Sequence, residues 1–572
     1  MSLTRSKQSS LQFVSRYASF TAAVAAIGST PTTLILDVPT TMTATTAVPA
    51  TLSIEVLASG TITRTTGTLT IVGSFYAGVR QVFINFGTDY VKFSPGFGRE
   101  VFPEWWGTTG DMAVYINAAI KSIAVYTAIG NSPSKRALGG GTVKLGPGSY
   151  TTNTPITMYQ SIRLIGAGKE STRIVAASMT NSNVIILSYI LVSGVGQLKA
   201  NISIRDLTIE GGSYTNNGVF SPEGYGLMLS SIKDVNIRYC GVGIRIEGGW
   251  LNKFVDIDTA DCIVGFVGIC LNSSRAFVRN MFDNFTIQRF TRTGMFISGE
   301  HNVLLGVVCE FSSWIGTDAA PANVNSHAFP VGIEIFGKDA TTLLLVGVRS
   351  YANIIQDSYF ESITGGVGGV GIYIDNVDMG VDGLSLNKRT KLLDNHFINN
   401  VDNPMYINNA HSTFIKEATF IADVHVTLGA GAVSTVIESE NTINIVDNTA
   451  AGGDYILHSS SMNDFSTPKI APGRTSKFFQ FAKNMVDDGT ITLPRVTKGG
   501  YGVIVGNNGA TLSHFVSSDA GAVTLINNTA DVVANADTDT KLCIGTASPQ
   551  EPIIIKNRLG AEKSVIILFW YD

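Results

Sequence analysis

Apolar and polar positions alternate along most of the chain, and the alternation recurs as one phrase between about residues 201 and 423. Each copy has a glycine followed by alternating apolar residues, a variable stretch, and a second apolar run that Asp or Asn often introduces. Examples are Gly226–Leu229 with Asp234–Ile237, and Gly243–Ile246 with Asp256–Asp258. Such alternation predicts strands, because successive side chains of a strand point to opposite faces.

The phrase recurs every few tens of residues without helical spacing, so it predicts a parallel β-helix in which each copy forms one coil. Equivalent residues of successive coils would then stand about 4.8 Å apart, the spacing of neighbouring strands. We expect an interior ladder that includes Ile237, Ile257, Ile287 and Phe360, and columns of outward residues on a long exposed face. Such a face suits an extended polymer better than a small molecule.

The sequence on either side of the repeats predicts other elements. Residues 1 to about 30 are typical of a short helix or arm, and residues 33–101 predict a small β region or preliminary coils. Apolar residues from Met112 to Ile123 have helical spacing, and Asp111 is placed to cap that helix. From about Ser476, short strands at about 8–12-residue spacing indicate a β-sandwich or jelly roll.

These patterns divide the chain into five parts. They are an N-terminal attachment or capping region (1–106), a short helix and linker (107–137), the parallel β-helix (138–425), a second linker (426–475), and a C-terminal β-sandwich for trimerisation or carbohydrate binding (476–572).

Composition agrees with stacked strands and excludes several classes of function. Only 15% of the residues are charged, against about 25% in typical proteins, and 59 glycines supply corners. A net charge of −4 with scattered signs offers no basic stripe for nucleic acid. We also expect no membrane span and no secretory signal. Cys240 and Cys262 each precede a coil glycine by three residues, which predicts small buried residues rather than a disulfide or zinc site.

Four motifs between residues 104 and 168 occur together in a known family. They are EWWG (Glu104–Gly107), Gly110–Asp111 at a helix start, GGxVxLxxGxY (Gly140–Tyr150) and IxLxGxG (Ile162–Gly168). This segment resembles the opening of pectate-lyase-like right-handed β-helix proteins, a family with a large branch of bacteriophage tailspikes and capsule depolymerases. The resemblance covers roughly residues 60–425, and it departs at Met112–Tyr115, where members often carry Thr-Asp-Asp-Thr. It implies a right-handed β-helix that acts as a lyase, glycoside hydrolase, deacetylase or pure binder.

The residue that follows the apolar anchor of each second run should face outward, and these residues should form one column. Read along the chain, the column is Glu210, Arg238, Asp258, Gln288, Glu310, Glu361 and Ile398. This register predicts Glu310 and Glu361 about 5 Å apart, as in retaining glycosidases, and Asp258 about 9.5 Å from Glu310, within the inverting range. Glu310, Glu361 and Asp258 are therefore the candidate catalytic residues. The alternative is that these acids only keep an exposed face soluble.

Other residues near this column are candidates for substrate binding or for different chemistry. Trp314 lies in a stretch that breaks the phrase beside Glu310, and it would stack on a sugar ring or contact another subunit. Gln288, Tyr359 and His301 are the other candidate substrate-binding residues. A lyase would instead need a base and a group that neutralises a uronate. Its candidates are His301 beside Glu300, with Arg275, Arg279, Arg289, Arg292 and Tyr359.

The combined patterns predict a tailspike-type protein that binds and depolymerises a bacterial surface polysaccharide, by hydrolysis rather than by β-elimination. A polysaccharide lyase and a receptor-binding spike or adhesin without catalysis are the alternatives. No cofactor or metal motif is present in the sequence. The N-terminal region would attach to a phage tail or adaptor protein, so the protein would belong to a virion and act at the bacterial cell surface.

The change of pattern after residue 425, together with the tailspike resemblance, predicts a stable homotrimer held partly by the C-terminal region. Sedimentation equilibrium at micromolar concentration should give three times the chain mass of 60.8 kDa. A monomer at that concentration would contradict the prediction.

Overall fold

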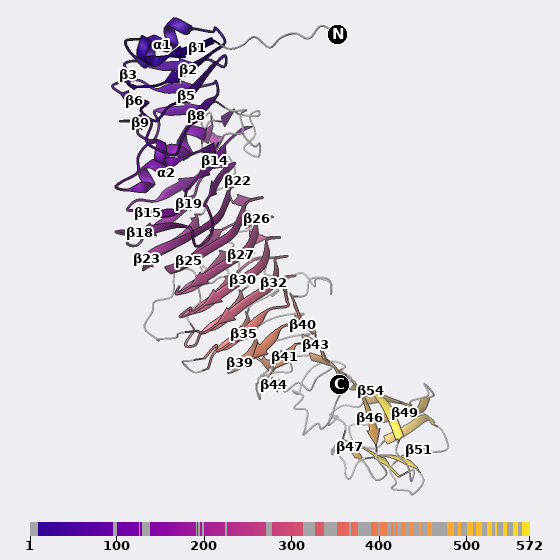
Figure 1. Ribbon diagram of the computed structural model, residues 1–572. Coiled ribbons are helices and arrows are strands. Elements are labelled where there is room, and N and C mark those ends of the chain that lie inside the picture. The colour runs from indigo at the N-terminus through magenta and orange to yellow at the C-terminus, as the bar shows by residue number, and fades with distance from the viewer. Residues whose placement is uncertain are drawn as a thin grey trace, which may run out of the picture. The chain divides into compact units, whose positions relative to one another are not determined.

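The structure is a computed structural model in which strands predominate (Figure 1). Two compact units make up the chain: residues 1–302, 310–327 and 339–348 form unit 1, and residues 303–309, 328–338 and 349–572 form unit 2. The described residues are 10–94, 100–124, 126–127, 138–189, 191–192, 195–196, 199–222, 226–269, 277–312, 327–336, 352–364, 368–375, 390–398, 401–408, 413–416, 418–420, 426–429, 435–439, 445–447, 455–459, 477–485, 490–492, 500–506, 511–517, 523–528, 532–534, 541–545, 553–558 and 563–571.

The N-terminal region of unit 1 already consists of coils, as one of the two alternatives predicted. Helix α1 (Phe20–Ile27) begins after Ser19, whose side chain accepts a hydrogen bond from the Ala22 N–H. β1 (Ser10–Phe13), which precedes this helix, and the strands that follow it form three parallel ladders. The ladders are β1 (Ser10–Phe13), β2 (Thr32–Leu36), β5 (Leu52–Val56) and β8 (Phe75–Ala77); β3 (Pro39–Met42), β6 (Thr61–Arg64) and β9 (Phe83–Ile84); and β4 (Thr46–Val48), β7 (Leu69–Ile71) and β10 (Val91–Phe93).

Helix α2 (Met112–Ile123) confirms the predicted amphipathic segment and its cap. The Asp111 carboxylate accepts hydrogen bonds from the Ala113 N–H, the Asn153 N–H and the Thr154 hydroxyl. Asn117 then exchanges side-chain hydrogen bonds of 2.8 Å with the Pro155 carbonyl and the Thr157 N–H. These contacts fix the helix to the first coils that follow it.

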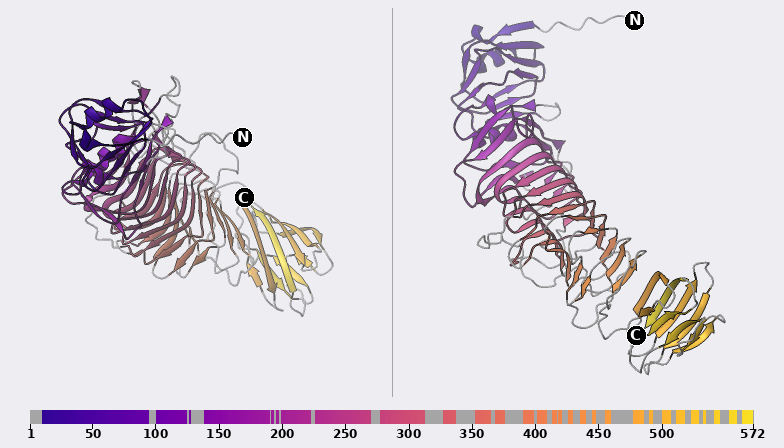
Figure 2. Two further views of the ribbon diagram at one scale, coloured as in Figure 1. Left: turned by 45° about the horizontal axis from the view of Figure 1, so that its top comes forward. Right: turned by 60° about the horizontal axis from the view of Figure 1, so that its bottom comes forward.

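The main coils of unit 1 form a parallel β-helix, and Figure 2 shows their strands lying side by side. One ladder runs through β14 (Gly141–Lys144), β17 (Ile162–Ile165), β23 (Ser203–Ser221), β25 (Ser231–Glu247), β27 (Lys253–Ala260) and β30 (Met281–Gln288). Others run through β15 (Gly148–Thr152), β18 (Thr172–Ala176) and β23; through β16 (Ile156–Met158), β19 (Asn183–Leu187), β23, β25, β28 (Val264–Ile269) and β31 (Thr293–Ile297); and through β22 (Lys199–Ala200), β24 (Leu227–Met228), β26 (Gly249–Trp250) and β29 (Phe277–Val278).

The interior of these coils is apolar, and one predicted neighbour relation in it is wrong. Ile237, Ile257 and Ile287 are all buried, as predicted. However, Ile237 pairs with Thr259 rather than with Ile257, and Thr259 pairs with Ile287. The buried threonine interrupts an otherwise apolar ladder, so the apolar anchor of this coil was placed two residues too early.

Cysteines also pack inside the coils, as predicted from their spacing. Cys240 and Cys262 are both free thiols with at most 1% of their surface exposed. A hydrogen bond to Cys262, together with burial, raises the pKa of the Cys240 thiol well above its ordinary value. The two residues therefore act as small apolar side chains.

Unit 2 contains further coils, which extend past the predicted boundary at residue 425. Its parallel ladders are β33 (Val331–Phe336), β36 (Val370–Asp375), β39 (Asn403–Asn408), β42 (Val426–Leu428) and β44 (Ile445–Asp447); β34 (Ile354–Gln356), β37 (Thr390–Leu393), β40 (Thr413–Lys416), β43 (Thr435–Ser439) and β45 (Tyr455–Ser459); and β35 (Tyr359–Glu361), β38 (His396–Ile398) and β41 (Thr419–Phe420). Residues 426–475 were predicted as a linker, but β42–β45 continue the coils to Ser459. Their short runs, such as Val426–Leu428, lack the glycine that marks earlier coils.

The C-terminal part of unit 2 is the predicted β-sandwich. One sheet has the order β46 (Lys477–Met485), β54 (Lys563–Tyr571), β48 (Gly500–Gly506), β49 (Thr511–Ser517) and β50 (Val523–Asn528). The other has the order β47 (Thr490–Thr492), β53 (Ile554–Asn557), β52 (Leu542–Gly545) and β51 (Val532–Ala534). Ile504, Phe515, Ile544 and Ile555 are fully buried in it.

A ladder of buried asparagines fixes one corner of the unit 1 coils. The Oδ1 atoms of Asn252, Asn280 and Asn302 accept the main-chain N–H groups of Ser230, Asn252 and Asn280 at 3.0–3.2 Å. Their Nδ2 groups donate to carbonyls one coil earlier, at 3.0–3.2 Å. The ladder satisfies main-chain groups that the turn would otherwise leave without a partner.

Replacing Asn280 with alanine should destabilise the β-helix, because it leaves the buried Asn252 N–H and other polar groups without a partner. The expected loss is about 1–3 kcal/mol of unfolding free energy for each such group. Urea unfolding followed by circular dichroism measures it. The exposed Asn153→Ala variant is the control, with an expected change within about 0.5 kcal/mol. Equal midpoints for the two variants would contradict this role of the ladder.

Candidate functional site

Four second runs of the unit 1 coils begin at a bend that Asp or Asn occupies. Asp206, Asp234, Asp256 and Asn284 all have positive φ, between 53° and 60°. Short polar side chains tolerate this left-handed conformation better than other L-residues. The Asp or Asn seen in the repeated phrase therefore sets the bend, after which the strand carries its outward side chains.

The pairing of strands defines the outward column and corrects one member of it. Glu210 pairs with Arg238, Arg238 with Ala260, and Ala260 with Gln288. The place predicted for Asp258 therefore belongs to Ala260. Asp258 lies two residues earlier, in a neighbouring column that contains Thr208, Asn236, Asp258 and Thr286. The predicted column was wrong here because the interior residue of this coil is the polar Thr259 and not the apolar Ile257.

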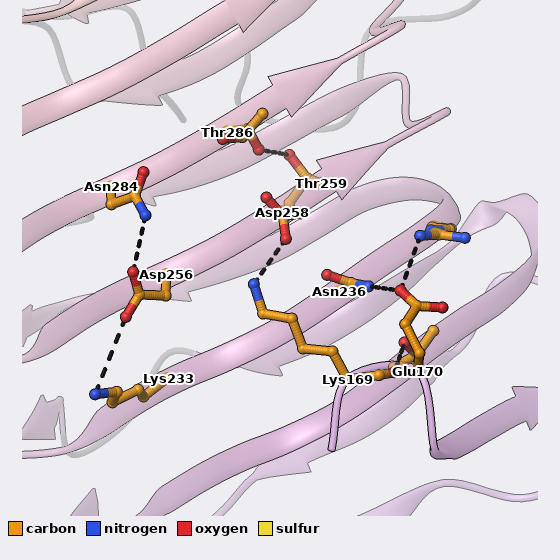
Figure 3. A network of polar contacts seen from close by, with 11 residues as sticks. Lys169, Glu170, Lys233, Asn236, Asp256, Asp258, Thr259, Asn284 and Thr286 are labelled. Carbon is orange, nitrogen blue, oxygen red and sulfur yellow. Dashed lines mark hydrogen bonds and ion pairs between the residues drawn. The ribbon is translucent and has the colours of Figure 1, made fainter.

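A turn that precedes β18 lies over this neighbouring column, as Figure 3 shows. Lys169 Nζ is 2.7 Å from Asp258 Oδ2. The adjacent Glu170 accepts a hydrogen bond of 2.7 Å from Asn236 and lies 3.5 Å from the Arg238 guanidinium. These contacts tie the turn to β25 and β27 and offset the charge of Asp258.

Glu310 has a different environment from the other glutamate of the same column in unit 1. Gln288 Nε2 donates a hydrogen bond of 2.9 Å to Glu310 Oε2, and the Arg289 N–H donates to the Glu310 carbonyl. Glu210, in contrast, forms an ion pair with Arg173. Glu310 is half-buried, and its carboxylate is oriented by a neutral amide, so its negative charge is not offset by the group that positions it.

Glu361 lies in unit 2, where it pairs with Ile398 as predicted. The Tyr359 hydroxyl donates a hydrogen bond of 2.7 Å to Glu361 Oε2, so these two predicted site residues are in contact. Glu310 belongs to unit 1, and its separation from Glu361 stays a prediction. Trp314 and Arg275 lie outside the described residues.

The residues proposed for a lyase do not lie together: Tyr359 is in unit 2, and the histidine and arginines are distributed over different places in unit 1. Val278 bridges to Glu300, so Arg279 and His301 occupy equivalent positions in successive coils, both with positive φ and both exposed. Arg289 lies at the other end of β30, where Asp261 holds it through two hydrogen bonds. Arg292 is buried. Of the candidate arginines that the structure describes, Arg279 therefore accompanies His301 at its corner.

A further group of polar residues lies in unit 2 and was not predicted. Glu334, Tyr373 and Tyr406 follow one another in the pairing of β33, β36 and β39. The two tyrosine rings stack at 5.2 Å, and burial together with the Asp375 and Glu334 charges raises the pKa of Tyr373. The signal was a polar or aromatic residue between two isoleucines, as in Gly332-Ile-Glu-Ile and Gly371-Ile-Tyr-Ile.

Two negative findings apply to the described residues alone. Within them, no group of three or more His, Cys, Asp or Glu side chains could hold a metal ion. No helix in that part of the chain is both long and apolar enough to cross a membrane.

Comparisons with known proteins gave matches among solved structures. No family model and no curated protein matches the chain. The matching structures include tailspike protein 2 of bacteriophage CBA120 (enzymatically active domain; 10% identity, 82% of this chain and 79% of that one, TM-score 0.43) and tailspike protein gp49 of Acinetobacter baumannii bacteriophage Fri1, a capsular polysaccharide depolymerase (13%, 76% and 80%, 0.32). They also include the A-module of a mannuronan C-5 epimerase of Azotobacter vinelandii (16%, 62% and 96%, 0.34).

Phage tailspikes are thus among the solved structures to which the chain is similar. At these identities and TM-scores the similarity says nothing about chemistry, so a function has to be argued from the residues.

Proposed function

We propose that this chain is a tailspike-type depolymerase that binds and cleaves a bacterial surface polysaccharide, capsule or O-antigen, by glycoside hydrolysis. The observation that carries the proposal is the Glu310 carboxylate, oriented by the neutral Gln288 amide on an outward column of stacked strands. A half-buried carboxylate positioned by a neutral amide can act on a bound sugar, whereas one held by an arginine already forms an ion pair. The regular coils offer the length that a polymer needs.

In this proposal Glu310 and Glu361 share the two roles of a glycosidase. One protonates the glycosidic oxygen, and the other attacks the anomeric carbon or activates a water, depending on whether the carboxyls lie about 5 Å or about 6.5–9.5 Å apart. Gln288 and Tyr359 would hold the two carboxylates and contact sugar hydroxyls. Trp314 would stack on a sugar ring of the same polymer.

Asp258 remains a weaker candidate for the second carboxylate. It lies in the neighbouring column, and its carboxylate is 2.7 Å from the Lys169 ammonium. Both facts favour Glu361 as the partner of Glu310. An Asp258→Asn variant is expected to retain most of the turnover.

One observation favours a lyase as the second candidate function. His301 and Arg279 stand at equivalent positions of successive coils, where they would supply a base and a cation for a uronate. A receptor-binding spike without catalysis is the third candidate. In each case we propose a homotrimer in a virion, attached to a phage tail or adaptor through residues 1–106.

Incubation with a panel of purified capsular and O-antigen polysaccharides separates the three functions. Product masses and the ultraviolet absorbance of the new chain ends are the readouts. We expect saturated oligosaccharides, which indicate hydrolysis. Unsaturated ends would identify a lyase, and unchanged polymer that stays bound would identify a binding protein.

Glu310→Gln and Glu361→Gln should each lower turnover by about a hundredfold or more, the usual scale for acid–base groups. Polymer binding and the melting temperature should stay unchanged, because a glutamine retains the size and hydrogen bonds of glutamate. The matched control is Glu210→Gln, because Glu210 lies in the same column but forms an ion pair with Arg173. This variant should retain turnover. Full activity in both site variants would contradict the proposal that the hydrolytic site lies in this column.

A further inference from the structure

The corner that follows the outward column in unit 1 carries a second row of aligned residues. They are Tyr239, Asp261, Arg289 and Phe311, here called the corner strip, with φ values of 56°, 54°, 51° and 54°. Main-chain hydrogen bonds from Asp261 N–H to Gln288 and from Arg289 N–H to Glu310, both 3.1 Å, fix them in successive coils. Each member directly follows a member of the outward column, and Phe311 follows Glu310.

The two aromatic members of the corner strip combine a positive φ with exposed rings. Bulky L-residues rarely adopt a positive φ; the bend before the outward column uses Asp, Asn or Gly, while Leu229 and Leu251 share this conformation at another corner. Tyr239 and Phe311 are also 45% and 49% exposed, so their rings contribute little to the core. Conformational strain combined with an exposed ring indicates selection for a contact outside the chain.

Between the two rings, the corner strip presents a fixed charged pair. Arg289 Nε and Nη2 donate to the two Asp261 carboxylate oxygens at 2.7 and 2.8 Å. This bidentate geometry holds the planar guanidinium in one orientation while half of its surface stays exposed. Its remaining N–H groups and the carboxylate can hydrogen-bond to hydroxyl groups without a net charge.

We infer that the corner strip binds sugar rings of the polysaccharide next to the linkage cleaved at Glu310, which rests on the proposed function. Tyr239 and Phe311 stack on the apolar faces of the sugar rings. The Asp261 carboxylate accepts hydrogen bonds from the sugar hydroxyls, and the Arg289 guanidinium donates hydrogen bonds to them. Aromatic faces with a few fixed polar groups are the usual lining of ligand sites. At about 4.8 Å per coil, the strip runs along the direction in which an extended polymer would lie on the coils.

Tyr239→Asn and Phe311→Asn test this inference, because Asn suits a positive φ but removes the ring. The probe is a purified capsular or O-antigen polysaccharide that the wild-type protein binds, and affinity electrophoresis measures its dissociation constant. Each substitution should weaken binding about tenfold, which corresponds to about 1.4 kcal/mol. The melting temperature should stay equal or rise. Tyr76→Asn, at an exposed tyrosine of the N-terminal coils, is the control and should leave binding unchanged.

The outcomes separate this inference from the proposed function. Unchanged binding in both variants, with cleavage retained by the wild-type protein, would overturn the corner strip and leave the depolymerase proposal intact. Weaker binding with a lowered melting temperature would assign the rings a structural role and also overturn it. Wild-type binding without cleavage would overturn the hydrolytic proposal, while loss of binding in the two variants would still support the strip.

Discussion

The parallel register between successive coils is the constraint on which the rest of the structure depends. Side chains of a strand alternate between two faces, so a slip of one residue would turn every outward group inward. In unit 1 the register is held by interior residues such as Ile237 and Ile287 and by the asparagine ladder from Asn252 to Asn302. Apolar packing provides most of the stability, and the hydrogen-bonded corners determine which residues align.

Because the register is fixed, residues that are distant in sequence become neighbours on the surface. Gln288 meets Glu310, and Lys169 reaches Asp258 across 89 positions of sequence. The same repetition aligns Tyr239 with Phe311 at one corner. A solenoid therefore places polar and aromatic groups in rows rather than in a deep pocket, which fits a polymer that is contacted at several consecutive sugars.

The sequence predicted the fold well because a period of two and repeated glycines are direct consequences of stacked strands. It predicted individual columns less well, since alignment depends on recognising the interior anchor, and a buried polar residue such as Thr259 disguises it. The turn that carries Lys169 could not have been predicted, because its partner Asp258 is defined only by tertiary pairing. Coils beyond residue 425 were missed because their runs are short and lack the marker glycine.

The most direct test of this account is a crystal structure of the E310Q variant with an oligosaccharide released from the polysaccharide that the wild-type protein cleaves. The account predicts sugar rings along the outward column, with a glycosidic oxygen within hydrogen-bonding distance of residue 310. Further rings should lie against Tyr239 and Phe311. An oligosaccharide bound only to the C-terminal β-sandwich, with no sugar near residue 310, would contradict it.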